Sequence, residues 1–207
     1  MLNAIRLILR IIGIPLFLIG GIGWFAPLAP LSWGSSDYEM PLGDLIGIAV
    51  DSSGDIYCCS QYYSRVQKYN SEGHFLFALQ INNGGAVRIR VNQNDQLEVV
   101  TTRNDRFYLF TPDGKMVKNK IDIQLFSEIG TQGETECRGP NGSLYKITSS
   151  LLFPSVVKIL PLGEESTIIS VPIQKWFFMG PFPAFLFWVL GLIFLGLSQQ
   201  KKKVQTT

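Results

Sequence analysis

Polar and apolar residues follow two different patterns along this chain. In the middle they change over within a few residues, as in Val87–Val91, where apolar and charged side chains alternate in the way of a strand with one buried face. Near both ends, by contrast, residues 11–36 and 176–198 contain no charged side chain at all. The pattern predicts a region of short strands between two apolar helices.

The strand pattern recurs along the chain. A shift of 41 residues places Val50 on Val91 and Arg65 on Arg106 without a gap, and a looser third copy places residues 142–145 on 54–57 and 157–160 on 66–69. A period near 40 residues with turn residues between short strands is typical of propeller blades. We therefore expect a mainly β fold of three four-stranded blades, a partial propeller, between two transmembrane helices. The predicted strands are 46–50, 55–59, 65–69 and 74–80, then 87–91, 96–101, 106–111 and 115–121, then 134–138, 143–148, 155–160 and 166–171.

The first apolar segment, residues 11–33, is long enough to cross a bilayer, which takes about 20 apolar residues. Pro27 and Pro30 indicate that its helix ends near residue 25 or 26 and therefore begins between residues 2 and 7. The alternative is a cleaved signal peptide, since residues 26–30 imitate a cleavage site, although the prolines disturb it.

The second apolar segment, residues 176–198, has no polar face, which argues against the alternative of a buried core helix. Pro181 and Pro183 fit the first turns of a helix. Three tryptophans are expected to act as membrane-interface anchors, namely Trp24, Trp33 and Trp176.

The charges divide by region. All sixteen acidic residues lie between Asp37 and Glu165, and residues 37–174 carry twelve Lys and Arg. The other basic residues are Arg6, Arg10, Lys175, Lys201, Lys202 and Lys203. Basic residues that flank a membrane span remain on the cytoplasmic side. All of these residues except Lys175 therefore predict cytoplasmic ends at 1–10 and 199–207 and an extracytoplasmic domain at 38–173. The blades of this domain are expected at about 46–80, 87–121 and 134–171. The protein is then a two-pass protein of the cell membrane, in contact with the lipid bilayer. No basic patch on the domain suggests nucleic-acid binding.

The segment Gly47–Tyr57, followed by residues 65–69 and 72–73, resembles the NHL repeats of β-propellers. The resemblance is partial in the second copy and faint in the third, and it covers about 120 of the 207 residues. Where the family usually has an Ala-Asp pair, this chain has Cys59-Ser60, Val100-Thr101 and Ile147-Thr148. The resemblance implies a binding platform rather than one activity. Family members that act as metal-dependent lyases need several histidines, whereas this chain has one.

Few residues suggest catalysis. His74 lies beside a turn, and Cys58, Cys59 and Cys137 lack metal-ligand spacing. The turn residues Asp51, Asp55, Asp95 and Asp113 could bind calcium, but ordinary turn chemistry explains them better. We expect no catalytic residue, no metal and no cofactor.

Four residues are candidates for binding. Arg88 and Arg90 share one strand face and have no counterparts at Gly47 and Ala49, so they line a channel, bind an anion or form a solvated edge. Tyr62 and Tyr63 lie in a loop between strands, where exposed aromatic residues often anchor partners.

Three blades are too few for a closed ring, since propellers typically have four to eight. A two-fold homodimer, a partner protein or an open sheet with covered edges would each solve this. The predicted function is a membrane-anchored binding or scaffold protein that makes protein contacts outside the cytoplasm and is not an enzyme. The alternatives are an accessory subunit of a transport or envelope-assembly complex and an enzyme whose site forms across an oligomer.

Overall fold

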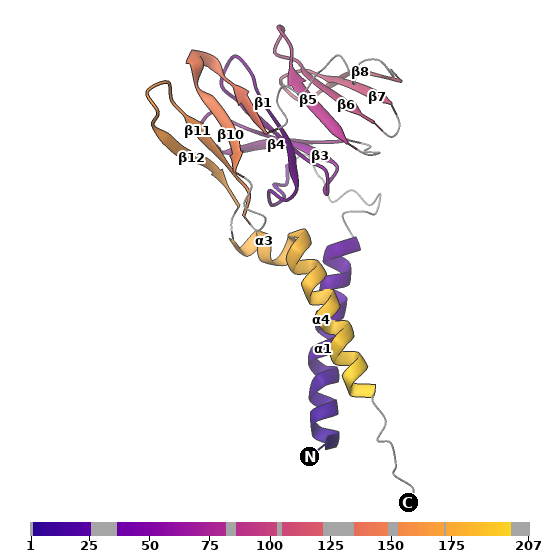
Figure 1. The fold of residues 1–207 in the computed structure, drawn as a ribbon. Coiled ribbons are helices and arrows are strands. Elements are labelled where there is room, and N and C mark those ends of the chain that lie inside the picture. Colours follow the sequence, from indigo (N-terminus) through magenta and orange to yellow (C-terminus); the bar gives the residue numbers. More distant parts are fainter. Residues whose placement is uncertain are drawn as a thin grey trace, which may run out of the picture. The chain divides into compact units, whose positions relative to one another are not determined.

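A computed structural model describes residues 2–25, 37–81, 86–102, 105–121, 135–148, 153–171 and 173–199 (Figure 1). The chain forms two compact units. One contains the terminal helices, Met1–Leu31 with Ile173–Thr207, and the other is the β unit, Ser32–Pro172. Trp33, Lys201, Lys202 and Lys203 lie outside the described residues, so their predicted roles remain predictions.

The helical unit contains α1 (Leu2–Phe25), α3 (Ile173–Met179) and α4 (Pro181–Gln199). Helix α1 begins within the predicted range. The second apolar segment differs from the prediction of one continuous helix over 176–198, because Gly180 separates α3 from α4 and Pro181 opens α4 at a position where proline is tolerated. Residues 3–25 and 182–199 are long and apolar enough to cross a membrane, and the first of these could also be a signal sequence.

Helices α1 and α4 pack closely through glycines, as expected where a side chain is missing. A methyl group built on Gly20 would lie 2.2 Å from the backbone nitrogen of Trp188, and one on Gly191 would lie 2.4 Å from that of Phe17. The ring of Trp24 packs against Phe185 with centroids 5.1 Å apart. Gly20 and Gly191 thus set how closely the two helices approach.

The β unit consists of three four-stranded antiparallel sheets, and within each sheet the strands follow chain order. We call them blades 1, 2 and 3. Blade 1 contains β1 (Leu45–Val50), β2 (Ile56–Ser60), β3 (Arg65–Tyr69) and β4 (Phe75–Gln80); blade 2 contains β5 (Val87–Val91), β6 (Leu97–Thr101), β7 (Arg106–Phe110) and β8 (Met116–Ile121); blade 3 contains β9 (Glu136–Arg138), β10 (Leu144–Thr148), β11 (Ser155–Ile159) and β12 (Glu165–Ser170). The predicted mainly β fold with three four-stranded units is confirmed, with strand ends within two residues of those predicted.

The 41-residue repeat extends to the backbone of the turns. Positive φ angles recur at Gly54 and Asp95, at Ser64 and Asp105, and at Gly73 and Gly114. The same turn chemistry accompanies them: the side-chain oxygen of Asp51 accepts hydrogen bonds from the backbone of Ser53 and Asp55, and Asn92 does the same for Asn94 and Gln96. These shared turns explain why the first two copies align without a gap.

The predicted alignment of the third copy is wrong by one residue in its second half. Strand pairing joins Ile56 to Tyr69 and, in blade 3, Leu144 to Ile159. Residues 156–159 therefore correspond to 66–69, whereas we expected 157–160. The expected alignment allows three extra residues between its two halves, whereas the connection between β10 and β11 is only two residues longer than the connection between β2 and β3.

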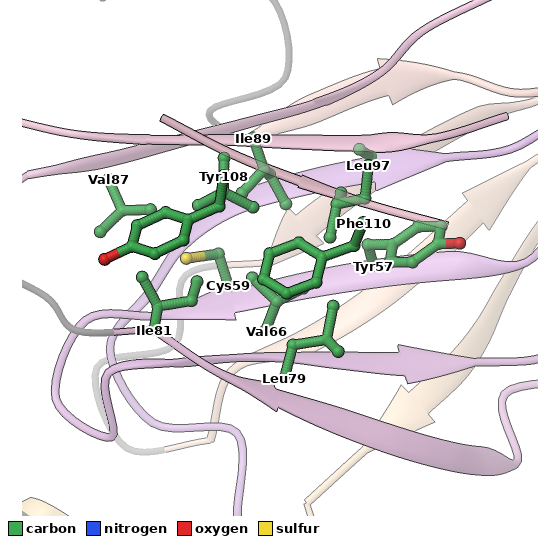
Figure 2. Packing of buried hydrophobic residues seen from close by; sticks show 12 residues of the cluster. Tyr57, Cys59, Val66, Leu79, Ile81, Val87, Ile89, Leu97, Tyr108 and Phe110 are labelled. Atoms are coloured by element: carbon green, nitrogen blue, oxygen red, sulfur yellow. The ribbon is translucent and has the colours of Figure 1, made fainter. Parts of the chain in front are cut away.

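Blade 1 lies between blades 3 and 2 (Figure 1). One of its faces joins blade 2 in an apolar core in which Tyr57, Cys59 and Val66 meet Leu97, Tyr108 and other side chains of blade 2 (Figure 2). Its other face meets blade 3, because Gly73 packs against Ile168 and Ile169 of β12. Every residue of β2 and β3 is consequently buried.

A buried lysine ties blade 1 to blade 2. The Nζ atom of Lys68, in a residue that is 4% exposed, lies 3.2 Å from a carboxylate oxygen of Asp51 and 3.0 Å from one of Asp55. It also donates a hydrogen bond to the carbonyl of Pro112 in blade 2, at 3.1 Å. Burial opposes the charged form, but hydrogen bonds with Tyr57 and Asp55 outweigh it and raise the pKa of Lys68 above its usual value.

We expect Lys68→Met to lower the free energy of unfolding by about 3–5 kcal/mol, because it leaves the buried carboxylate of Asp51 without its cation. Urea unfolding of the full chain in detergent, followed by the β signal in far-ultraviolet circular dichroism, measures this. Lys115→Met is the matched control, since Lys115 and Asp113 form an exposed pair, and it should change the midpoint little. Equal midpoints for the two variants would contradict the role of Lys68.

Candidate functional site: the hub cavity

The first strands of the three blades, β1, β5 and β9, surround a cavity of about 500 Å³ that we call the hub cavity. Each of the three strands contributes residues to the wall of the cavity. The wall consists of Ile48, Ala49, Val50, Ile89, Arg90, Val91, Glu136, Cys137, Arg138 and Leu144. It is therefore apolar along β1 and charged along β9.

Arg90 is the charged residue of blade 2 in this wall. Its Nε atom donates to Glu98 at 2.6 Å, and Asn92 donates to the other carboxylate oxygen of Glu98 at 3.3 Å. The side chain of Arg90 is 41% exposed, so the ion pair orients the guanidinium while leaving part of it accessible. Arg90 therefore lies in the cavity wall, whereas Arg88 is half-buried on the same strand and is not part of the described wall; whether either residue binds an anion stays a prediction.

Blade 3 supplies Glu136 and Arg138, which are exposed, with the half-buried Cys137 between them. These three residues were not predicted as site residues. The signal that would have identified them is their place in the first strand of the third copy, where Arg138 corresponds to Val50 and Val91. With Arg90, they give the hub cavity charges of both signs next to an apolar wall, an arrangement that suits a ligand or peptide segment with both charged and apolar groups.

A second cavity of about 360 Å³ lies at the first turns of the three blades and shares Val50, Val91 and Arg138 with the hub cavity. Two of these turns are joined by hydrogen bonds from the backbone and hydroxyl of Ser52 to the carboxylate of Asp95, at 2.9 and 2.5 Å. These bonds lower the pKa of Asp95 below its usual value. This rim is therefore fixed on the side of blades 1 and 2.

The acidic turn residues have partners within the protein. Asp51 and Asp55 pair with Lys68, Asp95 binds Ser52, and Asp113 accepts from the hydroxyl of Thr111 and pairs with Lys115. Within the described ranges, no three His, Cys, Asp or Glu side chains gather around one point. His74 is exposed and lies 3.4 Å from Glu72 in the same turn.

The two tyrosines occupy different environments. Tyr63 is only 4% exposed, which corrects the expectation that both tyrosines project from an exposed loop. The half-buried Tyr62 packs edge-on against Tyr63, with ring centroids 5.0 Å apart. Of the two, Tyr62 therefore retains more exposed surface for a partner.

Comparisons with known proteins give matches in solved structures alone. No protein-family model matches the chain, and no curated protein matches it. It is similar to a streptogramin B lyase, with a TM-score of 0.37 and 12% identity over 65% of this chain and 43% of that one. It is also similar to virginiamycin B lyase from Staphylococcus aureus (TM-score 0.33, 17% identity, 59% and 40%) and to the PQQ-bound aldose sugar dehydrogenase from Streptomyces coelicolor (TM-score 0.31, 15% identity, 60% and 47%).

This chain spans less than half the length of each of those structures. These identities and TM-scores are too low to support an argument, so the blade architecture is assigned from the strand pairing of this chain alone.

The native thiols should react very slowly. All three cysteines are free, and burial raises the pKa of Cys59 and of Cys137 to about 12. Because the thiolate is the reactive form, at pH 7.5 we expect maleimide labelling of the folded chain to be about a thousandfold slower than that of an ordinary cysteine. Mass spectrometry of labelled peptides measures this, with Lys115→Cys as the exposed reference. Labelling of Cys59, which is 1% exposed, as fast as that reference would contradict its burial.

Proposed function

We propose that this protein is a membrane-anchored binding protein whose NHL-like blade domain lies outside the cytoplasm and holds a segment of a partner protein at the hub cavity. The observation that carries the proposal is the wall of this cavity, where Arg90, Glu136 and Arg138 stand beside apolar side chains on a rigid scaffold. Among the described residues, its charged side chains serve recognition better than acid–base chemistry, because Arg90 is held by Glu98 and arginine does not release its proton near neutral pH.

The proposed topology is supported by the charge distribution and by the two apolar helices. Arg6 and Arg10 precede the first, and Lys201, Lys202 and Lys203 follow the second, which favours cytoplasmic positions for residues 1–10 and 199–207. The domain between the helices is net acidic, as suits a segment that is translocated. Trp24 and Trp176 would then anchor the helices at the interface.

Cysteine labelling in intact cells tests the topology. With a maleimide that does not cross membranes, Lys115→Cys in blade 2 should be labelled in intact cells, whereas Gln205→Cys in the basic tail should be labelled only after permeabilisation. The wild-type chain, with Cys58 and Cys59 buried and Cys137 half-buried, supplies the background. Labelling of the Gln205 position alone in intact cells would reverse the proposed orientation.

Site-specific photo-crosslinking tests the binding role. A photoreactive side chain at Gln93, which lines the rim of the cavity, should give one dominant product with another protein in cells. Arg138→Glu in the same chain should reduce that product severalfold, because it reverses a charge that borders both cavities. A photoreactive side chain at the exposed Lys115 is the matched control. Equal products from the two positions, or no effect of Arg138→Glu, would argue against the hub cavity as the binding site.

A further inference from the structure

The contact between α1 and α4 follows one line of positions on α1, spaced alternately by three and four, namely 10, 13, 17, 20 and 24 (Figure 1). A methyl group built on Gly13 would lie 3.0 Å from the Cβ atom of Phe194, and Gly20 continues the line in one direction. In the other direction the line reaches Arg10, whose Nε atom donates a hydrogen bond to the hydroxyl of Ser198 at 3.4 Å. The two helices are therefore antiparallel neighbours as far as Arg10 and Ser198.

Beyond this pair, the end of the contact is basic. Arg6 lies four residues before Arg10, so it is on the same face of α1, about 6 Å further along the axis. Helix α4, by contrast, continues for only one residue after Ser198 and ends at Gln199. Three lysines follow at 201–203, and the first α-carbon of these is at most about 7 Å from that of Gln199. The line of contact thus ends in two guanidinium groups with further positive charge close by in the chain.

The helical unit has no acidic side chain to neutralise these charges. All sixteen acidic residues lie between Asp37 and Glu165, which follow the end of α1 and precede the start of α3. They are therefore joined to the opposite end of the helix pair. The partner that the structure gives to Arg10 is the hydroxyl of Ser198, which is neutral. An anion for this end must come from outside the two helices.

The proposed position in the membrane makes such an anion necessary. At 1.5 Å per residue, α1 extends about 28 Å from Arg6 to Phe25 and about 22 Å from Arg10 to Phe25. The hydrocarbon core of a bilayer is about 30 Å thick. With Phe25 at one boundary, Arg6 lies at the other boundary and Arg10 about one turn inside it. A charged side chain at that depth is costly unless it extends to the headgroups and meets an opposite charge.

We propose that Arg6 and Arg10 together bind the phosphate group of one anionic phospholipid at this end of the contact between α1 and α4. Guanidinium groups bind phosphate through paired hydrogen bonds. Among the described residues, the hydroxyl of Ser198 engages the Nε atom of Arg10, which orients the side chain and leaves its two terminal nitrogens for the lipid. Two arginines and the three lysines at 201–203 favour a headgroup with net negative charge over a zwitterionic one.

This inference rests on the proposed membrane position of the helices but not on the direction in which the protein faces. It is also independent of what the hub cavity binds. The shared chemistry is a phosphate group, and the phospholipid is favoured as its source because the two arginines lie at the depth of the headgroups.

Native mass spectrometry of the full chain, released from vesicles of equal phosphatidylcholine and phosphatidylglycerol, tests this site. The wild-type chain should retain one phosphatidylglycerol. The double variant Arg6→Gln, Arg10→Gln should retain it severalfold less, and Arg10→Lys, which keeps the charge but loses the planar group, should be intermediate. Lys175→Gln is the matched control, because Lys175 is a basic residue before the other end of α4, and it should retain as much as the wild type.

The wild-type result alone can overturn the site, so the test does not depend on how the variants fold. Retention of the two lipids in proportion to the vesicle composition, or an equal loss in Lys175→Gln, would overturn it. Millimolar inorganic phosphate should not displace the lipid, and displacement would identify a free phosphate as the ligand instead. A chain that does not enter vesicles would refute the membrane anchoring itself, whereas one that enters and retains no anionic lipid refutes this site alone.

Discussion

The burial of both faces of the blade 1 sheet is the constraint on which the β unit depends. Every residue of β2 and β3 is buried, so neither face of these two strands is in contact with water. A strand such as Arg65–Tyr69 would expose a polar face if blade 1 were at the end of a stack. Because blade 2 covers one face and blade 3 the other, the first copy of the repeat occupies the centre.

This central position explains the unusual charges of blade 1. A lysine buried to the extent of Lys68 is costly unless it is paired and hydrogen-bonded. Here the first turn of the same blade supplies two carboxylates that neutralise the charge, and the neighbouring blade supplies a carbonyl that accepts a further hydrogen bond only when blade 2 is in place. Lys158 occupies the corresponding position in blade 3, lies over the Tyr145 ring and is half-buried. The buried charge thus couples the folding of one blade to the docking of the next.

Much of the fold could be predicted from the sequence because turn residues repeat with the strands. Asp51 and Asn92 build the same turn, and Gly73 and Gly114 the same backbone angle, so the first two copies were predicted almost strand for strand. The third copy was misaligned by one residue because a longer connection interrupts it. The order of the blades could not be predicted, since a repeat does not specify which copies are neighbours.

The candidate site was harder to predict than the fold. Arg90 stood out because its counterpart is Ala49, but Glu136 and Arg138 lie on a strand of three residues, which is too short for a clear pattern. Tyr63 was expected at the surface because loops are usually exposed, whereas its side chain is buried. The break between α3 and α4 was also missed, because an uncharged segment looks the same on both sides of Gly180.

Hydrogen exchange of the full chain in detergent, followed by mass spectrometry, tests the central place of blade 1 most directly. Amides that are hydrogen-bonded in a sheet covered on both sides open only with the whole domain, whereas those at the edges open locally. The account predicts slower exchange in β2 and β3 than in the equivalent inner strands of the other blades, β6 and β7 and β10 and β11. Slower exchange in those strands than in β2 and β3 would contradict it.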